Sequence, residues 1–482
     1  MKLYHIVGLA AGVVALTASG LAQSVTVNSN GGADFTSISL ALAAVQSNPA
    51  GPDVITIQNA GPFIETGTNQ APAILNITGD SANNDITIQA TSPSIRPLLI
   101  ASSPVTTPTI LIKKIGNALV RDLIIIPSVD RNQSAAVVSV DDTGVAGAAN
   151  GYNVTLRNIL VSSNNGTSQP LASLDGLTSP TYVPTQTNFT GDILNAASNV
   201  NSQINKLYNY DFVISGLIGN NFNGFRGFPD GAAGSEWVVG DGCVVSYCTA
   251  LSLTTHACWQ PGGDDGSADI VKLIGTQAKP VKFVNNFNLN AIQATGTGFV
   301  NNKLTCQWLM AANNLGSATG FIGGKTDQQH TFTNCTFVNN GTTAGRPQST
   351  FQQVTNATTT TLFTNVIAAG TGTEETLNAV KMTTTSPSTG QLILNQSAVV
   401  LNGPYKLTNT NFGGDGIEDS VNVVPTGVVN ADPQFASLNP ASANFLTVTN
   451  PAYATAGPGG VPLVGAGSYS PTAAVHDWSI YN

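Results

Sequence analysis

The residues with the clearest potential for chemistry are three aspartates in one short loop. The segment from Pro261 to Asp269 reads Pro-Gly-Gly-Asp-Asp-Gly-Ser-Ala-Asp, so Asp264, Asp265 and Asp269 fall within six residues. Carboxylate oxygens are the ligands that Ca²⁺ prefers, and the three together could bind one ion. The spacing is not that of an EF-hand, and a solvated Gly-Asp turn explains the same composition without a metal. The loop is our candidate metal site, with a plain turn as the alternative.

The same loop could instead supply the acids of a glycoside hydrolase. Such an enzyme needs a general acid and a second carboxylate that face each other across the scissile bond. Asp264 and Asp265 are adjacent, so on a strand their side chains would point to opposite sides. His256 and Cys258 have no fitting third metal ligand, and the chain contains no Ser-His-Asp order, phosphate loop or dinucleotide fingerprint. The sequence therefore holds no complete catalytic motif.

Aromatic residues concentrate just before this loop. Residues 206–260 contain nine of the 32 aromatic residues of the chain, more than double the average density. Aromatic faces pack on sugar rings, and an arginine can hydrogen-bond sugar hydroxyl groups. We predict that Tyr210, Arg226, Trp237 and Trp259 bind a polysaccharide or a cell-surface glycan. The alternative is that the rings fill the protein interior, where large apolar side chains usually lie.

Composition favours an all-β fold. Charged residues make up 9 % of the 482 residues, against a usual figure of about 25 %. Only five of the 26 acidic residues are Glu, and long amphipathic helices normally use Glu and Lys freely. The net charge of −9 argues against a nucleic-acid partner, which would require a basic face.

A repeated phrase indicates how the strands are organised. The segment Thr331 to Asn340 reads Thr-Phe-Thr-Asn-Cys-Thr-Phe-Val-Asn-Asn, and looser copies begin at Phe283, Phe299 and Phe363. Repeats of this length predict a solenoid, in which each unit buries its apolar face against its neighbours. We expect Phe332 and Phe337 to stack in the interior. We also expect Asn334 to occupy a left-handed bend, where its amide can bond the equivalent amide of the next coil. The residues predicted to continue this ladder are Asn158, Asn285, Asn301 and Asn365.

The N-terminus has the features of a secretion signal. Lys2 precedes an apolar run from Ile6 to Leu16, and Gly20 and Ala22 offer small residues for cleavage. No later segment is apolar and long enough to span a bilayer. We therefore expect residues 1–22 to be a signal peptide and the protein to be secreted or displayed at the cell surface, as a monomer.

The remainder divides into a solenoid, one interruption and a tail. Residues 23–469 carry the β-pattern, residues 470–482 form a C-terminal tail, and an excursion rich in Asn, Ser, Thr and Pro falls near 164–206. A short helix is expected within it, around Ile193 to Ile204. The five cysteines are an odd number, and we interpret them as buried stacked side chains, with a disulfide as the alternative.

Both ends of the solenoid resemble a known superfamily. A brief helix with Phe35, Ile38, Leu42 and Val45 on one face, capped by Thr36 or Ser37, precedes Gly61-Pro62-Phe63-Ile64-Glu65. This opening resembles that of pectinesterases, although their catalytic Asp pair and Arg are not present. The run Asn430-Ala431-Asp432-Pro433-Gln434-Phe435, followed by Phe445-Leu446, Asn450-Pro451-Ala452 and Val464-Gly465-Ala466, is similar to the closing signature of the bacterial pectin-lyase-like superfamily. The resemblance implies a single-stranded right-handed parallel β-helix with an N-terminal capping helix.

The resemblance also gives the candidate loop a second interpretation. Some β-helix lyases hold Ca²⁺ on an Asp cluster to acidify the proton next to a uronate carboxylate, and they use Lys or Arg as the base. Here Lys272 would be the base, beside Asp264, Asp265 and Asp269. Two hypotheses follow: a non-catalytic carbohydrate-binding or structural surface element, or a lyase or hydrolase acting on an acidic polysaccharide.

Overall fold

The structure is a computed structural model of the 482-residue chain. It describes residues 22–47, 51–66, 73–78, 85–101, 107–113, 116–127, 136–140, 152–162, 189–190, 192–196, 204–221, 223–227, 236–250, 257–261, 270–287, 289–293, 304–314, 320–323, 329–338, 340, 349–355, 360–370, 378–384, 391–401, 422–429 and 431–471. The predicted signal peptide, apart from Ala22, lies outside this part of the chain.

The described residues form an all-β protein dominated by one large parallel sheet of 21 strands. Its first row of strands is β1 (Ser24–Val27), β2 (Asp53–Ile57), β5 (Ile86–Ala90), β8 (Ala118–Ile126), β10 (Tyr152–Ser162), β13 (Ile204–Ser215), β16 (Glu236–Gly240), β20 (Ile270–Ile274), β23 (Thr305–Gln307), β26 (Gln329–Thr333), β29 (Thr360–Thr364), β32 (Gln391–Asn395) and β34 (Asn422–Thr426). Its second row continues from the far halves of β8, β10 and β13 and comprises β3 (Phe63–Glu65), β6 (Leu98–Ala101), β17 (Val244–Ser246), β21 (Val281–Val284), β24 (Leu309–Ala312), β27 (Thr336–Val338), β30 (Ile367–Gly370) and β33 (Ala398–Leu401).

Smaller parallel sheets accompany the large one. A seven-stranded sheet contains β4 (Leu75–Thr78), β7 (Ile110–Lys113), β9 (Val138–Val140), β12 (Leu194–Ala196), β15 (Phe225–Gly227), β19 (Ala257–Pro261) and β22 (Asn290–Ile292). The others are β11 (Phe189–Thr190) with β14 (Ile218–Asn221) and β18 (Thr249–Ala250), β25 (Gly320–Gly323) with β28 (Ser349–Thr355) and β31 (Asn378–Thr384), and β35 (Thr447–Val448) with β36 (Ser468–Tyr469).

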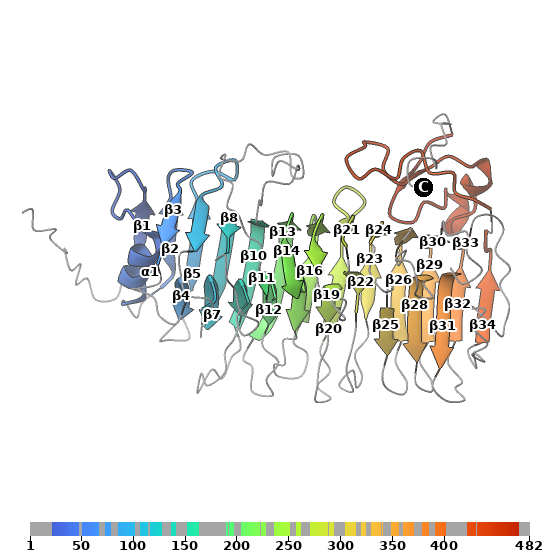
Figure 1. The fold of residues 1–482 in the computed structure, drawn as a ribbon, viewed down its shortest axis with the longest axis horizontal. Coiled ribbons are helices and arrows are strands. Elements are labelled where there is room, and N and C mark those ends of the chain that lie inside the picture. Colours follow the sequence, from blue (N-terminus) through green and yellow to red (C-terminus); the bar gives the residue numbers. More distant parts are fainter. Residues whose placement is uncertain are drawn as a thin grey trace, which may run out of the picture.

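Strand pairing follows the chain from one end of the molecule to the other. In the first row Val25 aligns with Ile55, Ile55 with Ile88, Ile88 with Val120 and Val120 with Leu156. Figure 1 shows the strands side by side along the long axis, with the colours in sequence order. Each strand therefore rests on the equivalent strand of the previous repeat, an arrangement compatible with a parallel β-helix.

Alternation of side chains builds the interior. In β2 and β5, residues at every second position are buried, including Ile55, Ile57, Ile86 and Ile88. Successive strand residues point to opposite faces, so one face of each strand enters the core and the other lies outside. The predicted aromatic stack is confirmed, because the rings of Phe332 and Phe363 lie 5.5 Å apart and those of Phe332 and Phe337 lie 5.9 Å apart.

The bend predicted at Asn334 is confirmed. Asn158, Asn334 and Asn365 adopt φ values of 54°, 53° and 52°, in the left-handed region that Asn tolerates best among residues with a side chain. Asn365 Nδ2 donates to Asn334 Oδ1 at 2.7 Å. Asn158 Nδ2 donates to Asp122 Oδ1 at 2.6 Å, so an aspartate takes one position of the column.

Asn285 does not continue that column, contrary to the prediction. It lies at a second bend, after β21, where Asn313 Nδ2 donates to Asn285 Oδ1 at 3.1 Å. The reason is register: Phe283 aligns with Ala311 and then with Phe337 in the second row, whereas Phe332 belongs to the first row. The sequence phrase is thus shared by two different strands of each repeat. Asn301 lies outside the described residues.

A third ladder is buried and was not predicted. Asn286 Nδ2 donates to Asn314 Oδ1 and Asn314 Nδ2 donates to Asn340 Oδ1, both at 2.8 Å, and Asn314 Nδ2 also reaches Phe283 O at 2.8 Å. All three amides are almost fully buried. A buried polar group that loses its partner costs about 1–3 kcal/mol.

Replacing Asn314 by leucine is therefore expected to lower the free energy of unfolding by roughly 2–4 kcal/mol, because it removes the buried hydrogen bonds that the Asn314 side chain makes with Asn286, Asn340 and Phe283 O. Chemical denaturation followed by circular dichroism measures the loss. The matched control is Asn444→Leu, which makes the same change at an exposed position. Equal stability of the two variants would contradict a structural role for the buried ladder.

One α-helix is present in the described residues. Helix α1 (Ile38–Gln46) begins after the N-cap Ser37, and Ile38, Leu42 and Val45 are buried against the first strands. The brief N-terminal helix and its cap are thus where the sequence predicted them. In the range 193–204, where a short helix was predicted, the described residues from Leu194 onward are instead in strands, because β12 occupies Leu194–Ala196 in the seven-stranded sheet and β13 begins at Ile204. Residues 197–203 lie outside the described residues. None of the helices among the described residues is long and apolar enough to cross a membrane.

The C-terminal segment, residues 431–469, lies beside the second row of strands (Figure 1). It contains the 3₁₀ turns η1 (Pro451–Tyr453) and η2 (Pro458–Gly460). Its apolar residues Phe435, Leu446 and Tyr453 join one buried cluster with Ala312 of β24 and Val338 of β27. The run that resembles a closing signature therefore covers the outer face of the second row between β21 and β33.

All five cysteines are free and buried. Burial raises the pKa of the Cys243 and Cys248 thiols to about 12. The interpretation of these residues as packed side chains is confirmed.

Candidate functional site

The loop predicted to bind Ca²⁺ falls outside the described residues. This applies to Asp264, Asp265 and Asp269 alike. Within the described part of the chain, no group of three or more His, Cys, Asp and Glu side chains is placed to hold a metal ion. The prediction of a metal site in this loop stays a prediction.

The predicted base Lys272 lies on the outer face of β20 and is engaged by a carboxylate. Its Nζ lies 2.5 Å from Glu236 Oε1 on the neighbouring strand β16, and Tyr208 OH donates to Glu236 Oε2 at 3.0 Å. Partial burial alone would raise the pKa of the Glu236 carboxyl, but the hydrogen bonds from Lys272 and Tyr208 lower it below its usual value. Glu236 is therefore ionised at neutral pH and pairs with Lys272. The role of Lys272 as a base stays a prediction.

Trp237 and Trp259 are in the interior, which corrects their assignment to a binding surface. Both side chains are fully buried, on β16 and β19, and their rings meet edge to face with centroids 6.2 Å apart. Trp237 alternates with Glu236 along β16, and because the glutamate faces outward the tryptophan must face inward. Neither ring presents a face to a ligand outside the protein.

Arg226 is exposed but belongs to another sheet. It lies on β15, its side chain is 51 % exposed, and its Nη1 lies 3.2 Å from Asp192 Oδ2. Asp192 Oδ1 also accepts from Asn223 Nδ2 at 2.8 Å. Tyr210 is on β13 of the large sheet, so Arg226 and Tyr210 do not share a strand row.

Tyr210 is the predicted binding residue that lines a groove. Its ring is half-buried and lies beside Tyr208, with centroids 6.0 Å apart and planes inclined by 31°. Gly240 on the next strand makes room for it, since a Cβ there would come within 2.4 Å of Tyr210 Cε1. Burial, with the nearby Tyr208 as a second cause, raises the pKa of the Tyr210 hydroxyl, so it is neutral and able to donate a hydrogen bond.

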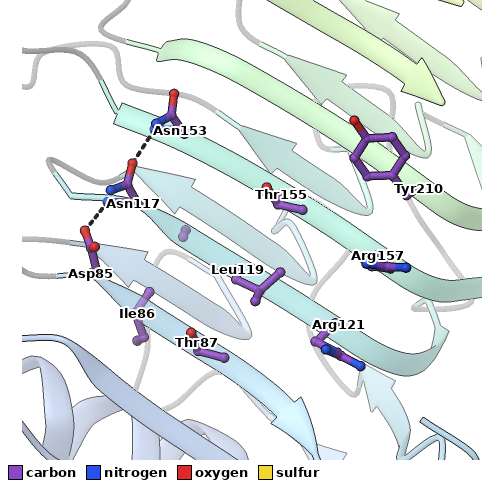
Figure 2. A pocket seen from close by; sticks show the side chains of 11 residues that line it. Asp85, Ile86, Thr87, Asn117, Leu119, Arg121, Asn153, Thr155, Arg157 and Tyr210 are labelled. Carbon is purple, nitrogen blue, oxygen red and sulfur yellow. Dashed lines mark hydrogen bonds between the residues drawn. The ribbon is translucent and has the colours of Figure 1, made fainter. Parts of the chain in front are cut away.

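The groove lies across the outer faces of β5, β8, β10 and β13 and has a volume of about 470 Å³ (Figure 2). Its lining, read across the strands, is Asp85, Ile86, Thr87, Asn117, Ala118, Leu119, Arg121, Asn153, Thr155, Arg157 and Tyr210. Asn and Asp side chains follow one edge, where Asn117 N donates to Asp85 Oδ1 at 2.8 Å and Asn153 N donates to Asn117 Oδ1 at 3.0 Å. Hydroxyl, amide and guanidinium groups thus surround an open, shallow surface.

Two arginines in the groove were not among the predicted site residues. Arg121 and Arg157 precede the bend residues Asp122 and Asn158 of the repeated phrase. A signal was present: in Val120-Arg121-Asp122-Leu123 and Leu156-Arg157-Asn158-Ile159, an arginine stands at the same place of two consecutive repeats. Equivalent places in consecutive repeats become neighbours, and the structure aligns Arg121 with Arg157.

No protein-family model, no curated protein and no solved structure matches the chain.

Proposed function

We propose that this protein is a right-handed parallel β-helix of the pectin-lyase-like type that binds a polysaccharide in the groove across β5, β8, β10 and β13, without cleaving it. The parallel register of the large sheet supports the β-helix, and crossovers between parallel strands are right-handed in about 98 % of cases. Export, predicted from residues 1–22, would bring the groove into contact with extracellular glycans.

The observation that carries the binding proposal is the Tyr210 ring at the end of a polar groove. Sugars present apolar C–H faces and a rim of hydroxyl groups, so their sites combine an aromatic face with hydrogen-bonding side chains. Here Thr87, Thr155, Asn117 and Asn153 supply the polar groups. Because strands in a stack repeat at about 4.8 Å, these groups form rows across the strands that suit an extended polymer.

The groove favours binding over catalysis. Asp85 is the only carboxylate among the described residues that line it, and it accepts a hydrogen bond from Asn117 N. A glycoside hydrolase requires two carboxyl groups about 5–10 Å apart. The lyase or hydrolase hypothesis retains Asp264, Asp265 and Asp269 as possible acids or Ca²⁺ ligands, and the experiment below includes it as an outcome.

Replacing Tyr210 by alanine is expected to weaken polysaccharide binding by roughly 5- to 30-fold, because a stacked ring contributes about 1–2 kcal/mol. Isothermal titration calorimetry with polygalacturonate, alginate, dextran sulfate and dextran measures the affinity. The matched control is Tyr247→Ala, which removes a tyrosine that does not line the groove.

Two results would overturn the proposal. One is the absence of binding to every polymer in the set. The other is cleavage that is lost in Asp265→Ala. Release of an unsaturated product absorbing in the ultraviolet would establish a lyase in its place, and release of new reducing ends without that absorbance would establish a hydrolase.

A further inference from the structure

Two like charges stand directly opposite each other in the groove. Arg121 on β8 and Arg157 on β10 are Cα partners in the parallel register, and Figure 2 shows their side chains next to each other at one end of the groove. Neighbouring strands are about 4.8 Å apart, and like charges directly opposite on a sheet are destabilising. Such a pair requires negative charge nearby.

The described residues supply only part of that charge. Asp122, whose side chain is 1 % exposed, lies 2.7 Å from Arg121 Nε and also accepts from Asn158 Nδ2. This carboxylate holds one edge of the Arg121 guanidinium and leaves the two Nη groups without a partner among the described residues. The Arg121 side chain is fixed in place by Asp122 but keeps donors for a ligand.

Arg157 is less well neutralised. Among the described residues, its nearest carboxylate is that of Asp211, whose Oδ2 is 3.9 Å from Nε, beyond hydrogen-bond distance. Asp211 Oδ1 accepts from Lys279 Nζ at 2.7 Å. The Arg157 side chain is 54 % exposed. Asp211 is therefore engaged mainly by Lys279, and the guanidinium of Arg157 is available.

A third arginine lies close to this pair. Arg96, almost fully buried, donates Nε and Nη2 to Asn158 Oδ1 at 3.0 and 2.7 Å, behind the bend. Among the described residues, the three cations of Arg121, Arg157 and Lys279 contact the two carboxylates of Asp122 and Asp211, which leaves an excess of one positive charge.

Asp85 does not balance the arginines. It aligns with Asn117, four residues before Arg121, and therefore lies about 13 Å from the arginine row along the strands. The groove is thus polarised, with its positive end at Arg121 and Arg157. Tyr210 continues the same row, because it is the register partner of Arg157 on β13.

We propose that Arg121 and Arg157 form a clamp for one anionic group, a carboxylate or a sulfate ester, on the sugar next to the one that packs on Tyr210. This assignment rests on the proposed polysaccharide binding. The planar guanidinium carries paired donors that match the oxygens of both groups, which a lysine ammonium does not. The bound anion would supply the negative charge that the opposed arginines lack.

The test compares polygalacturonate for carboxylate, dextran sulfate for sulfate and dextran for a neutral polymer. Arg157→Gln is expected to weaken binding of the preferred anionic polymer by about 10- to 100-fold, the usual contribution of a hydrogen bond to a charged group. Arg157→Lys should recover only part of the loss. Which anionic polymer shows the loss identifies the group.

Lys113→Gln is the matched control. It removes one positive charge from β7 of the seven-stranded sheet, outside the groove and away from Asp211. We expect its affinity to stay within about threefold of the wild type. Equal losses in both variants, or unchanged affinity in Arg157→Gln, would overturn the clamp while polysaccharide binding stands. Binding to none of the polymers would overturn the proposed function itself.

Discussion

Replacing Glu65 by alanine is expected to lower the free energy of unfolding by about 3–5 kcal/mol, since its buried carboxylate closes the N-terminal end of helix α1. Glu65 Oε1 accepts from Ile38 N at 2.7 Å, and Oε2 accepts from Ser37 Oγ at 2.9 Å and Ser39 Oγ at 2.6 Å. Alanine would remove the acceptor of Ile38 N and leave the two serine hydroxyls to bond to each other, 2.9 Å apart. It would also remove the negative charge that the helix dipole favours there.

Two measurements separate this role from general packing. Amide hydrogen exchange should speed up first in α1 and in β1 to β3, which contact the helix, while strands from β16 onward keep their protection. Ser39→Ala removes one donor and its hydrogen bond to Glu65 Oε2, and it should lower the free energy of unfolding by only about 1 kcal/mol. If Glu65→Ala and Ser39→Ala cost the same, the carboxylate would not be the element that closes the helix.

Glu65 also illustrates what could be predicted from the sequence. The opening motif Gly61 to Glu65 and the helix were identified together by resemblance, but the reason for the glutamate became visible only with the hydrogen bonds that join the two. Local patterns were sufficient to predict the strands, because a strand buried on one face shows alternating apolar and polar residues at consecutive positions. The bends at Asn334 and Asn365 were predictable for a similar reason, since few residues with side chains tolerate a left-handed backbone.

Register was the information that local patterns lacked. The phrase beginning at Phe283 resembles the one around Phe332, yet the two lie in different strand rows, so Asn285 was assigned to the wrong ladder. Trp237 could have been placed inside from its neighbour Glu236, because residues adjacent on a strand face opposite ways. The composition of the 206–260 segment drew attention to aromatic residues without saying which side of the sheet they occupy.

The arginine pair is a second feature that could be recognised only from the register of the strands. Arg121 and Arg157 are 36 residues apart in the chain and lie in ordinary-looking strands. Only the alignment of consecutive repeats turns them into neighbours, and only the geometry shows that Asp211 is engaged by Lys279. In a stacked fold, a site built across strands is therefore spread over residues that no short motif contains.

The C-terminal segment gives the second large effect, at Gly465. Val464 N and Gly465 N both donate to Asn365 Oδ1, at 3.1 and 3.3 Å, and Ala466 N donates to Thr336 Oγ1 at 2.9 Å. The bend amide of Asn365 thus serves the ladder through its Nδ2 and the C-terminal segment through its Oδ1. Gly465 has a φ of 54°, and a Cβ there would lie 2.3 Å from Thr336 Oγ1 and 2.7 Å from Cys335 O.

Replacing Gly465 by alanine is therefore expected to cost about 3–5 kcal/mol, from left-handed strain together with a clash against backbone. Gly459→Ala is the matched control: its φ is 75°, but a Cβ there meets nothing within 4 Å, so we expect the strain alone, about 1–2 kcal/mol.

Limited proteolysis should then cut residues 431–469 faster in Gly465→Ala than in Gly459→Ala. Release of this segment would uncover Ala312 and Val338, so the first variant should also bind a hydrophobic dye. Equal costs and equal cleavage would mean that the segment is not held at Gly465, and that the apolar contacts of Phe435, Leu446 and Tyr453 suffice to hold it.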